Sequence, residues 1–424
     1  MSTKVGFTAL LFGALSLQSA CSEVPAIAPP ADGVLKSANI LEFGPDDTLF
    51  VADSVSGKIF AYDLANVGTA PSDDKAYNLL DVEGVISRTV SFDPDSLVYN
   101  DLAVHPVTRE AYVSLQFAVD GIDQAAILNI SHDGSVTRLD IENLLPSVFT
   151  LEDVADENVT FWRDIPAPTL NVTDLDYVDG ELFVSGISTG EFASTLRRVP
   201  FPFDGPSVST SIEIFHAAHA QMETRAPIRA MTVVDLDGVQ TVVAAYTCTP
   251  LVTITTPELQ DGAHIAGKTI AELGYGNTPL DVIDFAASDL EGNVQRFVLV
   301  VNREMAADLI PIDALSAAAS SEGLSTPVPY LGATSGVETT PVPLSGVLHA
   351  ADQNNQFIVA MRRNLETGAM ELVSFRKGSF FRLSGFISEY NFPDYQYQEN
   401  QFAQGVRMFQ NLLKTDEGFP DQVR

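Results

Sequence analysis

The feature that most constrains the fold is a unit of short strands that recurs along the chain. Its clearest copy, residues 40–64, reads as two apolar strands around an acidic turn, a Ser-Gly break and a third strand, ILEFGPDDTLFVADSVSGKIFAYDL. The same alternating strand, tight turn and second strand return at residues 101–116, 172–187, 228–246, 280–302 and 348–363. One such small sheet cannot bury both of its faces, so the units must pack against one another.

Stacking of these units around an axis gives an all-β protein, a β-propeller, which we expect to span residues 37–395. The six units predict six blades. Seven blades are the alternative, because residues 200–211 and 326–342 could hold further strands. At the C-terminus, residues 396–424 are expected to form a helix and tail, since one helical face carries Phe402, Val406, Phe409 and Leu413.

A resemblance to known propellers lies in residues 43–64, FGPDDTLFVADSVSGKIFAYDL. This segment resembles the strand–turn–strand pattern of the broad YVTN, NHL and gluconolactonase-like group. The resemblance covers most of the chain as architecture, and it implies the fold alone. It transfers no catalytic residue, because none of the paired signatures that mark a particular enzyme of that group is recognisable.

The N-terminus is typical of a secretory signal peptide at residues 1–20. Lys4 precedes an apolar run at residues 5–17, which is too short to span a bilayer. The following Gln-Ser-Ala-Cys resembles the bacterial lipobox, in which Cys21 would be lipidated, although Gln18 stands where Leu, Val or Ile is usual. Ordinary cleavage after Ala20 is the alternative. We expect a Pro- and Ala-rich tether at residues 21–36 and a periplasmic outer-membrane lipoprotein, with a lipid anchor to the membrane.

The charge of the chain limits its partners. It carries 56 acidic and 23 basic residues, a formal charge of −33, which disfavours nucleic acid and anionic lipid headgroups. Its two cysteines are Cys21 and Cys248, so we expect no disulfide framework. With 46% hydrophobic residues, the chain can bury a large core without one.

Strand order predicts where a site would lie. In a blade, the start of the first strand and the end of the second strand lie on the same face. This places one residue of each unit at the channel mouth, namely Asn39, Asp101, Asp174, Arg229, Asp281 and His349, with Asn302 and Arg303 beside them. The carboxylates could hold Ca²⁺ or another divalent ion. Alternatively, they bond to backbone N–H groups and pair with the arginines, which could also bind an anionic ligand or a quinone.

A second candidate is the segment FHAAHAQME. On a helix, His216, His219 and Glu223 would project from one face and could hold Zn²⁺ or Fe²⁺. An ordinary amphipathic loop helix explains the segment equally. Cys248 ends a second strand, as a packed residue or as a thiol that His216 or His219 could reach as a base.

Two functions follow from these patterns. The first is a membrane-tethered binding or scaffold protein of the cell envelope that holds a small molecule or another envelope protein at the mouth. The alternative is an enzyme, either a metal-dependent lactonase-like hydrolase or a quinone-dependent dehydrogenase. In that case Asp101, Asp174 and Asp281 would hold the ion, His349 would be the general base, and Arg229 or Arg303 would stabilise negative charge.

Overall fold

The structure is a computed structural model, and the residues that it describes lie between Leu35 and Gly378. Within this range it omits residues 65–67, 73, 94, 162–163, 276, 289–291, 304, 343, 345 and 365–366. The predicted signal peptide, Cys21 and the predicted C-terminal helix at residues 396–424 lie outside the described residues. No helix among the described residues is long and apolar enough to cross a membrane.

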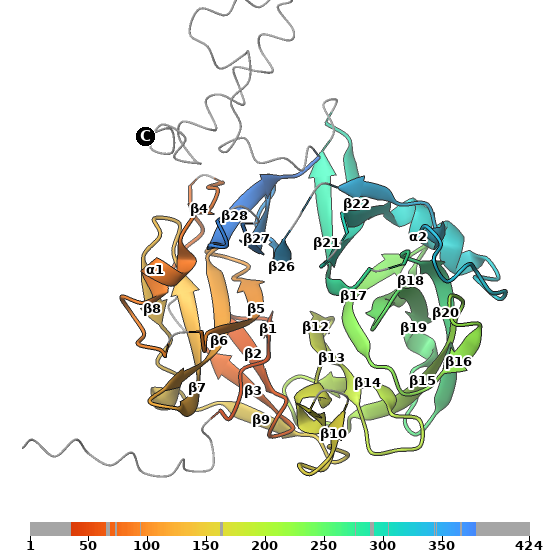
Figure 1. The fold of residues 1–424 in the computed structure, drawn as a ribbon, viewed down its shortest axis with the longest axis horizontal. Helices are drawn as coiled ribbons and strands as arrows, with labels where there is room; N and C mark the ends of the chain where they lie inside the picture. Colours follow the sequence, from red (N-terminus) through yellow and green to blue (C-terminus); the bar gives the residue numbers. More distant parts are fainter. Residues whose placement is uncertain are drawn as a thin grey trace, which may run out of the picture. The chain divides into compact units, whose positions relative to one another are not determined.

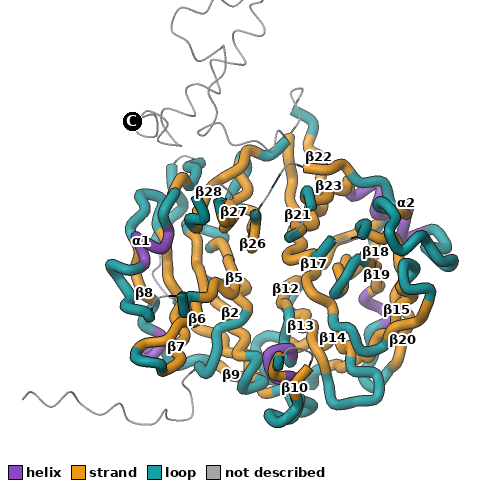
Figure 2. Tube along the Cα trace, viewed as in Figure 1, coloured by secondary structure: helices purple, strands orange, loops and turns teal. Residues whose placement is uncertain are grey.

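The described chain is a β-propeller of six blades, each an antiparallel sheet with its first strand at the central axis (Figures 1 and 2). The inner strands of blades 1 to 6 are β1 (Ile40–Phe43), β5 (Val98–Val104), β12 (Asp174–Val178), β17 (Ile228–Leu236), β21 (Pro279–Ser288) and β26 (Val347–Asp352). The second strands are β2 (Thr48–Asp53), β6 (Ala111–Val119), β13 (Glu181–Ile187), β18 (Val239–Tyr246), β22 (Val294–Asn302) and β27 (Phe357–Arg363).

The outer half of each blade completes these hairpins. The third strands are β3 (Lys58–Asp63), β7 (Ile122–Ile130), β14 (Ser194–Pro200), β19 (Pro250–Thr255), β23 (Ala307–Pro311) and β28 (Met370–Arg376). The fourth strands of blades 1 to 6 are β9 (Ser147–Thr150), β8 (Val136–Arg138), β15 (Val208–His216), β20 (His264–Glu272), β25 (Thr340–Val342) and β4 (Asn78–Leu79). The strands suspected in residues 200–211 and 326–342 therefore complete existing blades and do not form a seventh.

The remaining elements lie between the blades or at their edges. They are the helices α1 (Val82–Ile86) and α2 (Ile312–Ser320), the 3-10 turns η1 (Ile141–Asn143), η2 (Ala167–Leu170) and η3 (Thr256–Glu258), and the short strands β10 (Thr160–Phe161), β11 (Ile165–Pro166), β16 (Gln221–Glu223) and β24 (Ser335–Gly336). Strand β16 pairs with β15, and β24 pairs with β20. In addition, β15 pairs in parallel with β20, which joins blades 3 and 4 into one sheet.

The blades do not follow one another around the ring in sequence order. The inner strand β1 contacts β5 on one side and β12 on the other, while β5 contacts β26. The order around the ring is therefore 2-1-3-4-5-6, and Figure 1 shows β5 between β26 and β1. The chain passes from blade 1 to blade 2, returns along the outer edge of blade 1 as β9, and then enters blade 3.

Two outer strands, β9 in blade 1 and β4 in blade 6, come from a different part of the sequence than the rest of their blade, and they fix this order. Between blades 1 and 2, the chain pairs as β4 with β28 of blade 6. Just before β4, the buried Tyr77 donates its hydroxyl hydrogen bond to Ile130 O at 2.7 Å and accepts one from Ala111 N at 2.8 Å, both in blade 2. Its backbone N–H donates to Ser374 Oγ in blade 6 at 2.6 Å. A segment of early sequence therefore ties blade 6 to blade 2 and closes the ring.

The hairpin turns follow from the residues that the sequence places there. Asp179 and Gly180 have φ values of 51° and 87°, and Asp237 and Gly238 have 54° and 82°. Two consecutive positive φ angles are what a two-residue hairpin turn needs, and Asp-Gly supplies them at little steric cost. The predicted turns between first and second strands are confirmed at both places.

The hydrophobic core is divided among the interfaces between blades. One cluster of buried side chains lies between each neighbouring pair in the ring, including the pairs 1–2, 1–3 and 2–6 that the unusual order creates. Phe50 and Phe183, for example, are fully buried on opposite sides of blade 3. Because both faces of each sheet are covered in this way, the central strands are apolar along most of their length.

Candidate functional site

The six residues predicted for the channel mouth line a single cavity. This mouth cavity, of about 250 Å³, is lined by Asn39, Asp101, Asp174, Arg229, Asp281 and His349 together with parts of the six inner strands. In four of these strands, the register shifts at or just before the site residue, between Tyr99 and Asp101 in β5 for instance. Such bulges re-aim side chains at the ends of strands.

Around the ring, acidic and non-acidic residues alternate. In the observed blade order 2-1-3-4-5-6, the residues at the mouth read Asp101, Asn39, Asp174, Arg229, Asp281 and His349. Had the blades followed the sequence, the first two of the three carboxylates would be direct neighbours. The exchange of blades 1 and 2 inserts Asn39 between them and so reduces their mutual repulsion.

Each carboxylate ties its own blade to the next one. Asp101 accepts hydrogen bonds from Leu102 N at 2.8 Å and from Leu41 N of blade 1 at 2.7 Å. The carboxylates of the other two blades repeat this pattern, with 2.9 Å to the N–H of their own next residue and with 2.6 and 3.0 Å to Met231 N and Ala350 N of the neighbouring blade. The structural role considered for these residues is therefore present, and it holds the three carboxylates in fixed positions.

Burial raises the pKa of all three carboxyl groups. Burial and then the charge of Asp281 raise the pKa of Asp101 to about 7, and burial raises that of Asp281 to about 6. The pKa of Asp174 lies well above its usual range through burial and the other two carboxylates. The backbone N–H donors oppose these shifts without cancelling them. A positive charge in the cavity would favour the ionised forms.

The two basic side chains of the mouth differ in character. The guanidinium of Arg229 makes no hydrogen bond or ion pair with any residue that the structure describes, and Arg229 lines the mouth cavity. Burial lowers the pKa of Arg229, and the charge of the nearby Arg303 lowers it further. The three carboxylates of the mouth have the opposite effect and raise it. His349 Nδ1 lies 3.4 Å from Asp101 Oδ1, and burial together with Arg229 lowers the pKa of His349 to about 4. At neutral pH this imidazole is uncharged.

Asn302 and Arg303 are not among the described residues that line the mouth cavity. Asn302 is buried, and its amide donates to Asp308 Oδ2 and to Ala306 O, both at 2.9 Å, within its own blade. Arg303 is exposed, and its backbone N–H donates to Thr278 O at 2.9 Å. Of this pair, only Arg303 influences the mouth, through its charge on Arg229.

A second cavity continues the channel beyond the mouth. This channel cavity, of about 480 Å³, shares only Asp101, Asp174 and Asp281 with the mouth cavity among the described lining residues. The three carboxylates therefore form the neck between the two cavities. Further carboxylates follow below the neck, and they are Glu42, Asp176, Asp284 and Asp352.

These deeper carboxylates were not singled out from the sequence. Burial raises the pKa of Asp176 to about 7, and burial together with Asp176 raises that of Glu42 well above its usual range. A signal was present, because Asp176 follows Asp174 by two residues on one strand. Alternation along a strand places both side chains on the face that lines the channel.

The segment of His216, His219 and Glu223 is a hairpin, so the predicted helix is wrong. His216 ends β15, His219 lies in the turn, and Glu223 ends β16. Every second residue of β15 is buried from Thr210 to His216, and this period of two continues into the histidine. The alternation favours a strand, whereas the helical spacing of the two histidines is a coincidence of the turn.

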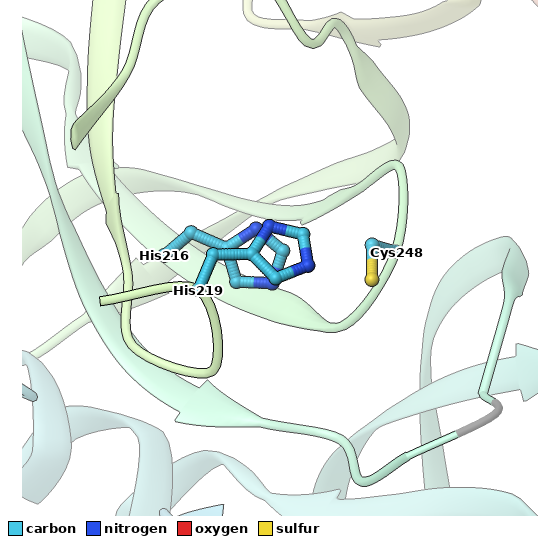
Figure 3. A group of neighbouring side chains, drawn as sticks. All are labelled: His216, His219 and Cys248. Atoms are coloured by element: carbon cyan, nitrogen blue, oxygen red, sulfur yellow. The ribbon is translucent and has the colours of Figure 1, made fainter. Parts of the chain in front are cut away.

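The hairpin nevertheless brings the three residues together. His219 Nδ1 lies 2.8 Å and His216 Nδ1 lies 3.0 Å from Glu223 Oε1. The ring centroids of the two histidines are 3.7 Å apart. Burial alone would raise the pKa of Glu223, but its contacts with the two histidines lower it to about 2. Cys248 lies beside the rings, as Figure 3 shows.

Comparisons with known proteins add little to this site. Neither a protein-family model nor a curated protein sequence matches the chain. Similar solved structures include a glucose dehydrogenase, with 9% identity, a TM-score of 0.29, and coverage of 80% of this chain and 98% of that one. Virginiamycin B lyase from Staphylococcus aureus has 8% identity, a TM-score of 0.34, and coverage of 81% and 96%.

Extracellular domains 1 and 2 of Drosophila semaphorin 1b are similar to the same degree. Their identity is 8% and their TM-score is 0.34, and the match covers 82% of this chain and 86% of that one. Likeness at this level carries no argument about activity. The assignment of the fold rests on the sheet order, and the assignment of a function must rest on the two sites themselves.

Proposed function

We propose that this β-propeller is a binding protein of the bacterial cell envelope whose mouth cavity holds a small positively charged group. The group is a divalent cation such as Ca²⁺, or the ammonium group of a small molecule. The observation that supports this proposal is the ring of Asp101, Asp174 and Asp281, held by backbone N–H donors around a cavity that opens on the channel mouth. An envelope protein that inserts a basic side chain would satisfy the same chemistry.

The charge balance of the cavity favours a cation. Three carboxylates converge on it, and Arg229 is the one cation among the described residues of its lining. Mutual repulsion adds to burial in raising the pKa of Asp101 and Asp174. A bound positive charge would relieve that repulsion, whereas an anion would add to it. The volume of about 250 Å³ suits an ion with its water molecules or a small head group.

Ligand atoms for an ion are close together. Asp101, Asp281 and His349 each offer one, and these atoms lie within 4.8 Å of one another. Carboxylate oxygens are the ligands that Ca²⁺ prefers, and the remaining positions would be taken by water. The neutral state of His349, which follows from its low pKa, leaves a lone pair for a cation or for a hydrogen bond from an ammonium group.

Isothermal titration calorimetry of the mature chain tests this proposal, with CaCl₂, MgCl₂ and ethylammonium chloride as separate titrants. We expect saturable binding of one titrant per chain at pH 7.5. Binding should weaken at least tenfold in Asp281→Asn and strengthen in Arg229→Ala, since that change removes a like charge. Asp123→Asn, at an exposed position in β7, is the matched control. An absence of saturable binding by all three titrants would refute the proposal.

A second candidate function is a metal-dependent lactonase-like hydrolase. It is favoured by the same three ligand atoms, because an ion there would polarise a carbonyl and activate water. The low pKa of His349 argues against its role as a general base at neutral pH, so the binding function is preferred. Calcium-dependent turnover of γ-butyrolactone by the wild type, lost in Asp281→Asn, would reverse this preference.

The proposal also includes a location in the cell, at the outer membrane. It rests on the apolar run at residues 5–17 and on Cys21 at the end of a lipobox-like segment. The mature chain would then be tethered to the outer membrane on its periplasmic side. Metabolic labelling with a palmitate analogue in a bacterial host tests it. Label on the wild type and none on Cys21→Ala supports lipidation, whereas an unlabelled, freely soluble wild type excludes it.

A further inference from the structure

Blades 3 and 4 carry a second group of side chains that the channel function does not use. His216 lies at the end of β15, His219 in the turn after it, and Cys248 in the loop between β18 and β19. Each offers one ligand atom, and the three atoms lie within 4.8 Å of one another. Figure 3 shows the two imidazole rings against each other, with the thiol beside them.

A carboxylate orients the exposed histidine. Glu223 Oε1 accepts a hydrogen bond at 2.8 Å from His219 Nδ1, because a carboxylate can only accept. The lone pair of His219 therefore lies on Nε2. Carboxylates that hold one imidazole nitrogen and leave the other for a metal are typical of metal sites. His219 thus has the tautomer that a metal ligand needs.

One ring nitrogen of the buried His216 lacks a well-directed hydrogen bond. His216 is fully buried, and its Nδ1 makes no well-directed hydrogen bond within the described part of the chain, although Glu223 Oε1 is 3.0 Å away. Its Nε2 lies 3.4 Å from Thr249 Oγ1 and 3.7 Å from Glu272 Oε2. Of the two ring nitrogens, Nδ1 therefore has only this charge contact with Glu223, and a metal ion bound at the ring would give the buried imidazole a better partner.

Two buried or half-buried carboxylates surround this pair of rings. Glu272 is 2% exposed, accepts from Thr249 Oγ1, and accepts from Ala218 N at 3.2 Å. Glu223 faces both rings from the other side. A divalent cation would offset two of the three negative charges that the two carboxylates and a metal-bound Cys248 thiolate carry.

The open side of the cluster faces a cavity of about 360 Å³. It is lined by His219, Cys248 and Glu272 from the blades and by residues 328–330, 332 and 333 of a long loop. Tyr330 of that loop stacks on His219 with ring centroids 5.9 Å apart, and Tyr275 lies 5.4 Å from Tyr330. A metal ion with three protein ligands would keep a coordination position toward this aromatic-walled space.

We propose that His216, His219 and Cys248 bind Zn²⁺, with a fourth position open to the cavity for an exchangeable ligand. Imidazole nitrogen and thiolate sulfur are the ligands that Zn²⁺ prefers. Around tetrahedral Zn²⁺ such atoms lie about 3.3 to 3.6 Å apart, as bond lengths of about 2.0 to 2.3 Å require. The three ligand atoms, which now lie within 4.8 Å of one another, would have to move closer together when the ion binds. His219 and Cys248 can make this movement, because both are exposed and lie outside the strands.

This site is independent of the mouth cavity, since the two share none of their described lining residues. It is tested on the mature chain with Co²⁺ as a spectroscopic substitute for Zn²⁺. We expect a thiolate-to-metal charge-transfer absorption that saturates at one Co²⁺ per Cys248 site and is lost when Zn²⁺ displaces the Co²⁺. The absorption should vanish in Cys248→Ser, and the affinity should fall at least tenfold in His219→Gln.

Control variants keep the test decisive. His264→Gln changes a histidine that stacks on Phe192 elsewhere in blades 3 and 4, and it should leave Co²⁺ binding unchanged. In Asp281→Asn, at the mouth, the charge-transfer band should keep its intensity, because this band reports the Cys248 thiolate alone. The two substituted residues, Cys248 and His219, are exposed, so both variants are expected to fold, and circular dichroism verifies this. A substitution of the fully buried His216 is left out, because it would disturb packing as well as metal binding. No charge-transfer band with the folded wild type, or the same band in Cys248→Ser, would overturn the proposal.

Discussion

Asp176 lies in the channel below the carboxylate neck and accepts a hydrogen bond from Val233 N at 2.5 Å. Burial raises the pKa of Asp176 to about 7, whereas an aspartate in the unfolded chain has a pKa near 4. The folded state therefore binds the proton of Asp176 more tightly than the unfolded chain does. The stability that this proton contributes is present below about pH 4 and is lost as the pH rises toward 7.

Asp176→Asn keeps the acceptor for Val233 N and removes the charge. We expect the variant to gain on the order of 1 to 3 kcal/mol over the wild type at pH 8 and much less at pH 4. Urea unfolding at both pH values measures the difference, with Asp123→Asn as an exposed control. A gain of equal size at both pH values would show that Asp176 does not carry a raised pKa.

Tyr77 makes the second prediction at this scale. Its buried hydroxyl bridges two backbone groups of blade 2, whereas the buried hydroxyl of Tyr99 has no hydrogen-bond partner among the described residues. Tyr77→Phe should therefore cost about 1 to 3 kcal/mol of unfolding free energy, because Ile130 O and Ala111 N lose their partner. Tyr99→Phe should be nearly neutral. Similar losses in both variants would contradict this account of Tyr77.

At the scale of elements, the strands that the sequence predicts are those with a long pattern. Each of the six first-and-second strand hairpins was predicted, because strand alternation acts locally, helped in two of them by an Asp-Gly turn. Strands β4 and β9 were not predicted. They are two and four residues long, and only partners distant in sequence make them strands. The hairpin of β15 and β16 was mistaken for a helix for a related reason, since its turn imitates helical spacing.

The placement of β9 on blade 1 can be tested by cross-linking. Lys58 of β3 is paired with Thr150 of β9 in antiparallel register. In a Cys248→Ser background, cysteines at both positions should form a disulfide on mild oxidation, seen as faster migration in a non-reducing gel. A cysteine at Arg138, in the outer strand of blade 2, is the control partner for position 58. Cross-linking of 58 to 138 and not to 150 would contradict the observed arrangement.

The whole molecule explains why its mouth can carry three carboxylates. The order 2-1-3-4-5-6 separates Asp101 from Asp174 by Asn39, and each carboxylate bonds across to the next blade. Strand direction alone predicted that one residue of each inner strand would lie at the mouth, and these six residues line one cavity, whereas Asn302 and Arg303 do not line it. Their alternation could not be predicted, because it depends on the exchange of blades 1 and 2, and no local pattern encodes that exchange.

The arrangement of whole blades also limits how far the proposed Zn²⁺ site of His216, His219 and Cys248 can be predicted from the sequence. His216 and His219 are close in sequence, but Cys248 and Glu272 come from other strands of blade 4 and its loops. Their convergence depends on the parallel pairing of β15 with β20, which joins blades 3 and 4. A fold with separate blades would not bring Glu272 within 3.7 Å of His216.

The most direct test of the central claim, a cation site at the mouth, is equilibrium dialysis of the mature chain against Ca²⁺ at pH 7.5 and pH 5. We predict one ion per chain at pH 7.5 and release at pH 5, because Asp101 and Asp281, with pKa values of about 7 and 6, then take up protons. Cys248→Ser should bind Ca²⁺ as the wild type does. No Ca²⁺ bound at pH 7.5, or equal binding at both pH values, would contradict the claim.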